Sequence, residues 1–322
     1  MASLIYHAGA LGDFITTLPA IARWREELPG ERLILLGRPA HAAIAAPPFD
    51  ETWDAGAAVF SPLFSDGVKA DSPLSGKLSV VTSALLFAAA SSPLAASLAR
   101  LGVSEIVRQD PFPSSVIHVI DYHLSFFPGQ DRGEQRIPQI LVPRTEPWDV
   151  AAIHPGSGSA KKNWPRARFI ELAARLVERG VRISWILGPA ETDIEPPPSA
   201  DQNPPSVATN PPSVTTNPPS VATNPPSVAT NPPSVAVWRS LPLPTLAGRL
   251  ARCRLYVGND SGVTHLAAAA GCPTVALFGE SDPRVWAPRG TRVKVLMSGS
   301  HGMGAIGVGD VLRVCEDFLK EK

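Results

Sequence analysis

Short apolar runs alternate with amphipathic stretches along the first part of the chain. The apolar runs there occupy residues 4–6, 33–37, 78–82 and 104–108. Residues 14–28 carry apolar side chains at helical spacing directly after the first run, which predicts a helix. Strands that are apolar throughout, with helices between them, are typical of a parallel sheet covered on both faces. The pattern therefore predicts a first α/β domain.

The same alternation returns in the second part of the chain. Apolar runs there occupy residues 150–154, 182–188, 254–259 and 273–278, and helical spacing occupies residues 165–179, 263–270 and 306–322. Between the two parts, residues 135–147 contain three prolines and no sustained helical period, which predicts a linker. We therefore predict an N-terminal domain over residues 1–145, a C-terminal domain over 146–305, and a closing amphipathic helix over 306–322.

A tandem repeat interrupts the second domain. Residues 203–237 consist of five copies of a seven-residue unit close to NPPSVAT. Two prolines in every unit exclude a helix, so the seven-residue period does not indicate a coiled coil. Such a unit buries no apolar face, and we predict polyproline II or disordered coil in an expanded surface loop. A docking tract for a proline-binding partner is the alternative.

The composition is that of a globular protein, with 44% hydrophobic and 18% charged residues. Lys plus Arg and Asp plus Glu number 29 each, so no net field attracts nucleic acid and an anion needs a local site. Three scattered cysteines support neither a zinc site nor a disulfide framework. Residues 1–6 do not resemble a signal peptide, and the apolar stretch 84–101 is too interrupted to span a bilayer. We expect a cytoplasmic protein.

The strongest chemical signal is the segment VGNDSGVTHLAAA at residues 257–269. It predicts a strand, a small polar loop and a helix, in that order. Backbone amides at the start of such a helix attract phosphate, and here they belong to Ser261, Gly262, Val263 and Thr264. We expect Gly262 to let a diphosphate approach the backbone closely. The alternative is an ordinary helix start capped by Asp260 or Ser261.

Two further segments have the same strand–loop–helix form. The loop HPGSGSAKKNWP at residues 154–165 carries Ser157, Gly158, Lys161 and Lys162, and lysine supplies a mobile charge for phosphate. It lacks the remainder of a dinucleotide fingerprint and the P-loop spacing, so neither NAD binding nor a P-loop is supported, and a solvated lysine pair is the alternative.

The turn GALGD at residues 9–13 follows the first strand. Ligands of open α/β sheets lie at the carboxyl ends of strands, which places Gly12 and Asp13 beside a cleft. The carboxylate of Asp13 could take a proton from an attacking hydroxyl there. The alternative is an N-cap of the following helix.

Taken together, these segments resemble the ADP-heptose:lipopolysaccharide heptosyltransferase family, glycosyltransferase family 9. The similarity covers GDxxxTLPA at residues 12–20, HPGSGSxxKxWP at 154–165 and GNDSGVTHLAAAAGCPTVALFG at 258–279. It extends over most of the chain and is more specific in the second half. The resemblance implies a GT-B fold, in which two Rossmann-like domains face a cleft. The first would bind the acceptor and the second the nucleotide sugar.

The resemblance also implies roles for single residues. Asp13 would be the general base, Lys162 would stabilise the departing diphosphate, and the amides of residues 261–264 would bind its oxygens. The remaining substrate-binding residues implied are Gly12, Ser157, Gly158, Lys161, Asp260 and His265, and for His265 a structural role is equally open. The family inverts the anomeric centre without a metal, so neither metal nor cofactor is expected.

The implied reaction moves a sugar, heptose by resemblance, from a nucleotide diphosphate sugar such as ADP-heptose to a lipopolysaccharide-core-type acceptor. That acceptor would be lipid-linked, at the inner membrane, to which the protein could bind peripherally. The repeat departs from the family pattern, and residues 241–245 then remain for the nucleotide pocket. Basic acceptor contacts cannot be matched, and Arg38, His41, Lys69 and Lys77 are candidates by location only. A non-catalytic nucleotide-sugar-binding protein, or another GT-B activity such as an epimerase, is the alternative.

Overall fold

The computed structural model describes most of the chain. Its described residues are 1–46, 48–65, 67–69, 71–127, 136–143, 146–188, 191 and 235–321. The predicted coil of the repeat over residues 203–234 lies outside them and stays a prediction. The last three repeat residues are described, and there the prediction of a loop is wrong, because they begin strand β8, in which Val237 and Trp238 are buried.

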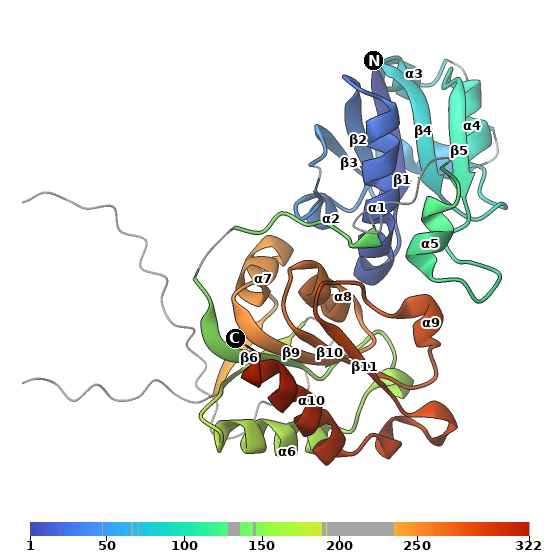
Figure 1. Ribbon diagram of the computed structural model, residues 1–322. Coiled ribbons are helices and arrows are strands. Elements are labelled where there is room, and N and C mark those ends of the chain that lie inside the picture. The colour runs from blue at the N-terminus through green and yellow to red at the C-terminus, as the bar shows by residue number, and fades with distance from the viewer. Residues whose placement is uncertain are drawn as a thin grey trace, which may run out of the picture.

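The N-terminal domain is a five-stranded parallel sheet with the order β3-β2-β1-β4-β5 (Figure 1). Its strands are β1 Ala2–His7, β2 Arg32–Gly37, β3 Glu51–Asp54, β4 Val81–Phe87 and β5 Glu105–Gln109. Its helices are α1 Leu11–Glu27, α2 Pro39–Ala42, the 3-10 helix Ala58–Phe64, α3 Leu74–Leu78, α4 Leu94–Arg100 and α5 Val119–Leu124. The apolar strands are buried on both faces, as the sequence pattern predicts.

The C-terminal domain is a six-stranded parallel sheet with the order β8-β7-β6-β9-β10-β11. Its strands are β6 Trp148–His154, β7 Arg182–Leu187, β8 Val235–Arg239, β9 Cys253–Asn259, β10 Thr274–Phe278 and β11 Val293–Met297. Its helices are α6 Arg166–Val177, α7 Leu243–Leu250, α8 Gly262–Ala269, α9 Pro283–Trp286 and α10 Val308–Lys320, with 3-10 turns at Ala160–Lys162, Gly299–His301 and Met303–Ala305. This strand order is that of a Rossmann fold.

The two domains contact each other through α1 and α8 and near α5 (Figure 1). Helix α1 packs on helix α8. Within α5, Asp121 forms a bidentate ion pair with Arg289, with the two nitrogen–oxygen distances at 2.7 and 2.5 Å. The ring of His118 also lies 2.9 Å from the carbonyl oxygen of Ala287. A polar and an apolar contact therefore flank the space between the domains.

Most of the predicted elements are confirmed, with three kinds of correction. The predicted strand at 78–82 is shifted, because Leu78 ends helix α3 and β4 begins at Val81. Strands β3 and β11 were not predicted, since each is only four or five residues long and partly exposed. Helix α1 begins at Leu11, three residues before the predicted start, because the small residues of the turn already adopt helical geometry.

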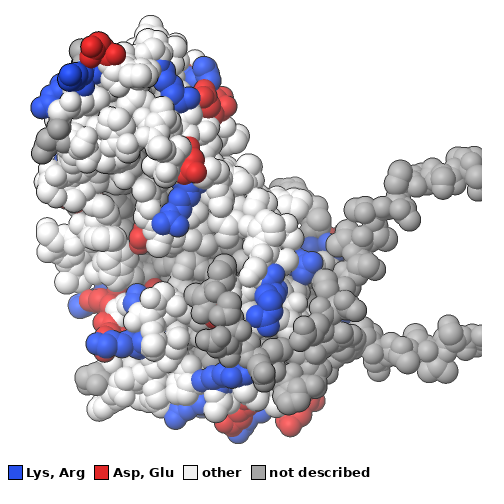
Figure 2. All heavy atoms as spheres, turned by 180° about the vertical axis from the view of Figure 1, so that it is seen from behind, with Lys and Arg blue, Asp and Glu red and all other residues white. Residues whose placement is uncertain are grey.

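On the face shown in Figure 2, Lys and Arg side chains are scattered and lie between uncharged residues or beside Asp and Glu. Among the described helices, none combines the length and the apolarity that crossing a membrane requires.

Candidate active site

The three motifs meet because of the strand order. Strands β6 and β9 are neighbours in the C-terminal sheet, and the chain leaves them toward opposite edges. Strands β1 and β4 have the same relation in the N-terminal sheet. Ligands of open parallel sheets bind where strand order reverses in this way, outside the carboxyl ends. The turn after β1 and the loops after β6 and β9 all start at such points.

Asn259, the last residue of β9, anchors the loop that follows β6. Its side chain is fully buried, and its amide nitrogen donates to the carbonyl oxygen of Pro155 over 2.8 Å. Its side-chain oxygen, Oδ1, accepts the backbone N–H of Trp164 over 2.9 Å. Both ends of the loop are thereby tied to the neighbouring strand, so Lys162 inside it has a fixed position.

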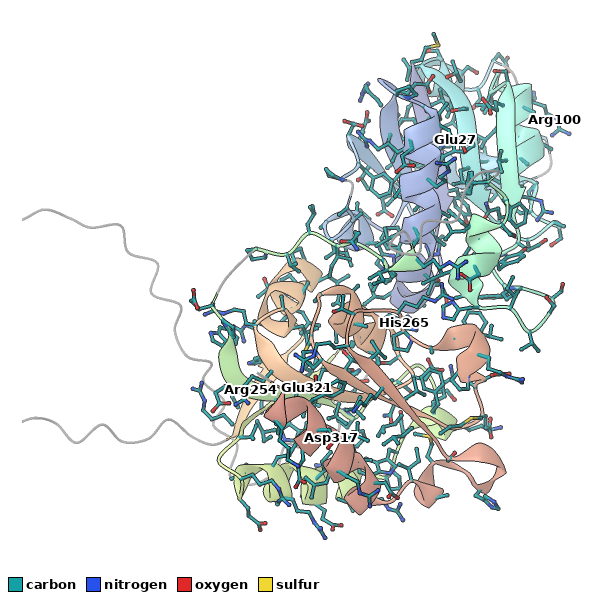
Figure 3. The ribbon with its side chains drawn as sticks, in the orientation of Figure 1. Glu27, Arg100, Arg254, His265, Asp317 and Glu321 are labelled. Atoms are coloured by element: carbon teal, nitrogen blue, oxygen red, sulfur yellow. The ribbon has the colours of Figure 1, made fainter. Side chains whose placement is uncertain are left out.

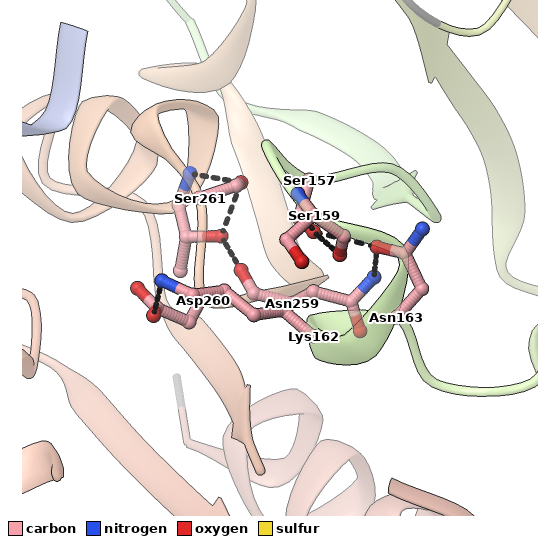
Figure 4. A network of polar contacts seen from close by, with 8 residues as sticks. Ser157, Ser159, Lys162, Asn163, Asn259, Asp260 and Ser261 are labelled. Atoms are coloured by element: carbon pink, nitrogen blue, oxygen red, sulfur yellow. Dashed lines mark hydrogen bonds and ion pairs between the residues drawn. The ribbon is translucent and has the colours of Figure 1, made fainter. Parts of the chain in front are cut away.

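Ser157 shapes the same loop from within (Figure 4). Its hydroxyl oxygen lies 2.7 Å from the carbonyl oxygen of Ser159 and 2.7 Å from Oδ1 of Asn163. The side chain of Ser157, which was predicted to bind substrate, is therefore hydrogen-bonded within its own loop. Gly158 beside it is exposed and lines the cavity described below.

Helix α8 begins with free backbone amides, as predicted. Ser261 is the N-cap, and its backbone and side-chain oxygens accept the amide of Thr264. The hydroxyl of Thr264 is fully buried against that of Tyr256. The structure therefore contradicts the prediction that Thr264 presents a free amide. Ser261, Gly262 and Val263 precede the first intrahelical bond, and their amides find no acceptor among the described residues.

Lys162 and Asp260 form an ion pair beside these amides (Figure 4). Nζ of Lys162 lies 2.6 Å from Oδ2 of Asp260. The carboxylate is buried with 8% of its side chain exposed, whereas the lysine side chain is 39% exposed. Asp260 therefore holds the ammonium in place and leaves part of it open to a ligand. The alternative that Asp260 caps the helix does not hold, because Ser261 does.

Asp13 approaches from the other domain. It occupies the first turn of α1, and its Oδ2 accepts the backbone N–H of Ala10 over 3.3 Å, so it is not the N-cap residue. Burial raises the pKa of this carboxyl, and Asp260 adds to the rise. The Ala10 hydrogen bond and the charge of Lys162 act in the opposite direction. A carboxylate with a raised pKa binds a proton more readily than an exposed aspartate.

Gly12 and Gly262 allow the two helix starts to touch. A Cβ atom at Gly262 would lie 2.9 Å from Cβ of Leu11 and 3.0 Å from the nitrogen of Gly12. A Cβ atom at Gly12 would lie 3.4 Å from the Cα atom of Gly262. The close approach predicted for Gly262 exists, but it is made by the N-terminal domain. Both helix N-termini therefore direct partial positive charge toward one region.

A cavity of about 310 Å³ lies between the domains at this point. Its lining residues are Ala10, Gly12, Asp13, Thr16 and Phe112 from the N-terminal domain, and Gly158, Lys162, Asp260, Ser261, Gly262, His265 and Trp286 from the C-terminal domain. The described part of the chain gathers no three His, Cys, Asp or Glu side chains as metal ligands.

His265 belongs to this cavity and to the core of α8 at the same time. Figure 3 shows it at the junction of the two domains. It is 7% exposed, and burial lowers its pKa to about 4, against the opposing effect of Asp260. The ring is therefore neutral near neutral pH. A substrate-binding role and a structural role for His265 are both compatible with this position.

Val263 faces a second, smaller cavity of about 150 Å³ in the C-terminal domain. Its lining is largely apolar and consists of Ile186, Leu187, Gly188, Trp238, Ser240, Leu241, Leu243, Leu246 and Val263. The segment predicted as the remnant of the nucleotide pocket contributes Leu241 and Leu243. Nearby, the buried carboxylate of Glu191 accepts the N–H of Gly188 over 2.7 Å.

Sequence reasoning missed several lining residues and included three that line neither cavity, Ser157, Lys161 and Thr264. Of these, Lys161 is exposed. Phe112 of the N-terminal domain and Trp286 of the C-terminal domain were not predicted, yet both line the cavity and their rings meet edge to face with centroids 5.6 Å apart. No sequence pattern pointed to Glu191, because only folding brings this residue to the ends of β6 and β7.

Part of the chain is similar to a known protein family. Residues 224–305 match the sequence model of glycosyltransferase family 9 (heptosyltransferase). The resemblance to this family is confirmed. The match lies where the specific motif, residues 258–279, is found. A search of curated protein sequences found no match.

Solved structures of this family share the whole fold. A family 9 glycosyltransferase from Veillonella parvula DSM 2008 superposes with a TM-score of 0.71 at 16% identity, covering 100% of this chain and 97% of that one. E. coli ADP-heptose LPS heptosyltransferase II gives 0.67 at 16% identity, covering 99% and 98%. E. coli heptosyltransferase WaaC with ADP gives 0.60 at 17% identity, covering 99% and 100%. The predicted GT-B fold is therefore confirmed, and the family match supports a role in sugar transfer.

Proposed function

We propose that the protein is an inverting glycosyltransferase that moves heptose from ADP-heptose to a hydroxyl of a saccharide acceptor. One observation carries the proposal. Asp13 of one domain and Lys162 of the other line a single cavity, together with the free amides at the start of α8. A base and a set of diphosphate-binding groups on opposite walls are what an in-line displacement requires.

The reaction follows from this arrangement. The acceptor oxygen attacks the anomeric carbon of the donor from the side opposite the diphosphate, and its proton passes to the carboxylate of Asp13. The bond from the anomeric carbon to the diphosphate oxygen breaks, and the electron pair leaves with the nucleoside diphosphate. Lys162 and the amides of Ser261 and Gly262 bind the negative charge that develops there. The ion pair with Asp260 keeps the lysine oriented before substrate arrives.

The nucleoside would lie on the C-terminal domain. The apolar cavity beside Val263 adjoins the same helix start and suits the flat face of a base. Glu191, at the end of β7, would accept hydrogen bonds from the ribose hydroxyls, a role that acidic residues play in other dinucleotide folds. E. coli WaaC is described with ADP and with ADP-2-deoxy-2-fluoro heptose, which supports this class of donor.

The acceptor we propose is lipid-linked and of the lipopolysaccharide-core type, used by the protein in the cytoplasm at the inner membrane. The support is the similarity to the E. coli enzyme named for lipopolysaccharide. We also propose that the transfer needs no metal, because Lys162 and the α8 amides supply the positive charge. The TibC glycosyltransferase of E. coli, described as iron-containing, is a structural neighbour at a TM-score of 0.51 and 16% identity, with 97% of this chain and 67% of that one covered, so this point needs a direct test.

The testing experiment is transfer from ADP-heptose to a lipid A–Kdo acceptor, with and without EDTA. We expect turnover by the wild type in both conditions and a loss of about 10²-fold or more in Asp13→Asn, because general base catalysis contributes about this much. Calorimetry should show unchanged ADP binding in the variant. ADP binding without turnover by the wild type would contradict the proposed reaction, and loss of turnover in EDTA would contradict metal independence.

A further inference from the structure

One histidine ring makes two hydrogen bonds that link helix α5 to the C-terminal domain. Nε2 of His118 lies 2.9 Å from the carbonyl oxygen of Ala287. The other ring nitrogen, Nδ1, accepts the backbone N–H of Ile120 over 3.2 Å and so caps α5. A nitrogen that accepts a hydrogen bond carries no proton, so the neutral ring has its proton on Nε2. Nε2 therefore donates to Ala287, and a single neutral ring both caps the helix and joins the domains.

This bridge lies between two loops that reach the interdomain cavity. Phe112 and Trp286 line that cavity and are in ring contact across the domain boundary, and each lies on the loop that holds one end of the bridge. The loop after α9 is itself seated on α8, because a Cβ atom at Gly290 would lie 2.6 Å from the carbonyl oxygen of Ala268. The bridge from His118 therefore holds the N-terminal loop against a wall that is fixed on the C-terminal side.

The surroundings of the bridge favour the neutral ring. Burial is the main cause that lowers the pKa of His118, and the positive charges of Arg289 and Arg136 add to the fall. The hydrogen bond to Ala287 and the charge of Asp121 act in the opposite direction. The Asp121 carboxylate is, however, already engaged by the guanidinium of Arg289. A positive charge on the ring would thus lie beside a cation whose counter-ion is occupied.

A second proton on the ring is also incompatible with the cap of α5. It would occupy Nδ1 and point toward the N–H of Ile120, which then has no acceptor on the ring. On the side of α8, the ring lies close to His265, whose pKa it lowers, so no negative charge faces it from that helix. Protonation of His118 and the bridge therefore exclude each other.

We propose that His118 is a positioning residue for the transfer reaction, and that its neutral ring ties the loop after α9 to α5 and holds the interdomain cavity closed. The inference rests on the proposed function for the reaction alone, because the bridge and its response to acid are properties of the two domains. Below about pH 6.5 a released His118 takes up a proton that the bridged ring excludes. The closed arrangement is therefore favoured at neutral pH and weakens as the pH falls.

The test measures the separation of the two domains in the full-length protein by pulsed electron paramagnetic resonance. Spin labels are attached to Arg100→Cys on α4 (Figure 3) and Arg313→Cys on α10, both at exposed positions. The three native cysteines are buried, which protects them from labelling. We expect a single separation for the wild-type His118 background at about pH 7.5, and a second, longer one at about pH 5.5.

His118→Asn separates the two hydrogen bonds of the ring. Its side-chain oxygen can still cap α5, but its amide is too short to donate to Ala287. We expect the longer separation at both pH values, with the ratio of closed to open forms lowered about two- to tenfold, which corresponds to one hydrogen bond. In the transfer assay KM should rise by a similar factor and kcat should change less, because bound substrate favours the closed form.

Two further variants complete the test. His118→Gln places an amide donor near Ala287 and cannot titrate, so it should restore the closed form and remove its acid response. His301→Asn alters an exposed histidine and should behave as the wild type. Wild-type separations in His118→Asn, or an acid response as large as that of the wild type, would overturn the inference. Absence of sugar transfer with these separations as expected would instead contradict only the proposed function.

Discussion

The two walls of the interdomain cavity are built in different ways. On the C-terminal side, Lys162 is paired with a buried carboxylate and its loop is tied to β9 by the side chain of Asn259. On the N-terminal side, the Asp13 carboxylate accepts a single hydrogen bond, from the N–H of Ala10 at 3.3 Å. A wall whose charged groups are held by several partners is already organised for a charged leaving group, whereas a less constrained wall can accommodate different acceptors.

The largest expected effect concerns the charge on the C-terminal wall. Lys162→Met should lower kcat by about 10²–10³-fold, which is the usual cost of removing one group that stabilises developing negative charge. Lys161→Met is the matched control, since Lys161 is exposed and lines neither cavity, and it should change kcat by less than about threefold. Equal losses in the two variants would show that the ion pair with Asp260 does not orient the catalytic cation.

The next effect concerns the bonds that organise this wall. Asn259→Ala leaves the carbonyl of Pro155 and the N–H of Trp164 buried without their partner, at about 1–3 kcal/mol for each group. Urea unfolding should therefore show about 2–3 kcal/mol less stability, together with weaker ADP binding. Asn163→Ala, which removes a partly exposed side chain from the same loop, should cost about 1 kcal/mol or less. The reverse order would contradict the anchoring role of Asn259.

The N-terminal domain should respond more to acid. His7, His41 and His123 are buried among Phe14 and Phe87, and burial lowers their pKa values to about 3, 4 and 4. The unfolded chain takes up protons below about pH 6.5, while the folded domain resists until about pH 4, so stability falls as pH falls through this window.

Each of these histidines contributes at most about 1.4 kcal/mol per pH unit to that fall. His41→Phe keeps the ring that stacks on Phe14 and removes one titrating group. Urea unfolding at pH 6.5 and 5.5 should show a drop smaller by about 1 kcal/mol in the variant. An unchanged drop would mean that His41 is charged in the folded protein.

The smallest expected effect concerns the ion pair between Asp121 and Arg289, which links the two domains. Asp121→Asn weakens a largely buried ion pair with Arg289, whose side chains are 24% and 22% exposed, but it leaves a polar side chain in place, so we expect a cost of about 1 kcal/mol. We expect a fall in kcat/KM of about fivefold or less with both domains folded. Asp110→Asn breaks a pair with Arg108 within one domain and should leave kcat/KM unchanged, as measured in the transfer assay. A fall in both variants would assign the loss to surface charge rather than to domain contact.

Local sequence patterns were sufficient to predict many of the strands and the start of helix α8. The apolar runs gave the parallel strands, and the sequence VGNDSGVT gave the helix start with its free amides, since both depend on neighbours within a few residues. Strand β8 was missed because its first residues continue a proline-rich repeat and are strand only through pairing with β7. The amide of Thr264 was misassigned because its engagement depends on the geometry of the cap.

The α/β class, the division into two halves and the three loops that carry polar residues follow from local patterns, because periodicity and turn residues act over short distances. The shared cavity of Asp13 and Lys162, the contact that Gly262 makes with α1, and the lack of a carboxylate partner for Arg38 among the described residues follow from the folded arrangement. Strand order and domain packing set these relations. They join residues that are far apart in the chain, and no local pattern records such contacts.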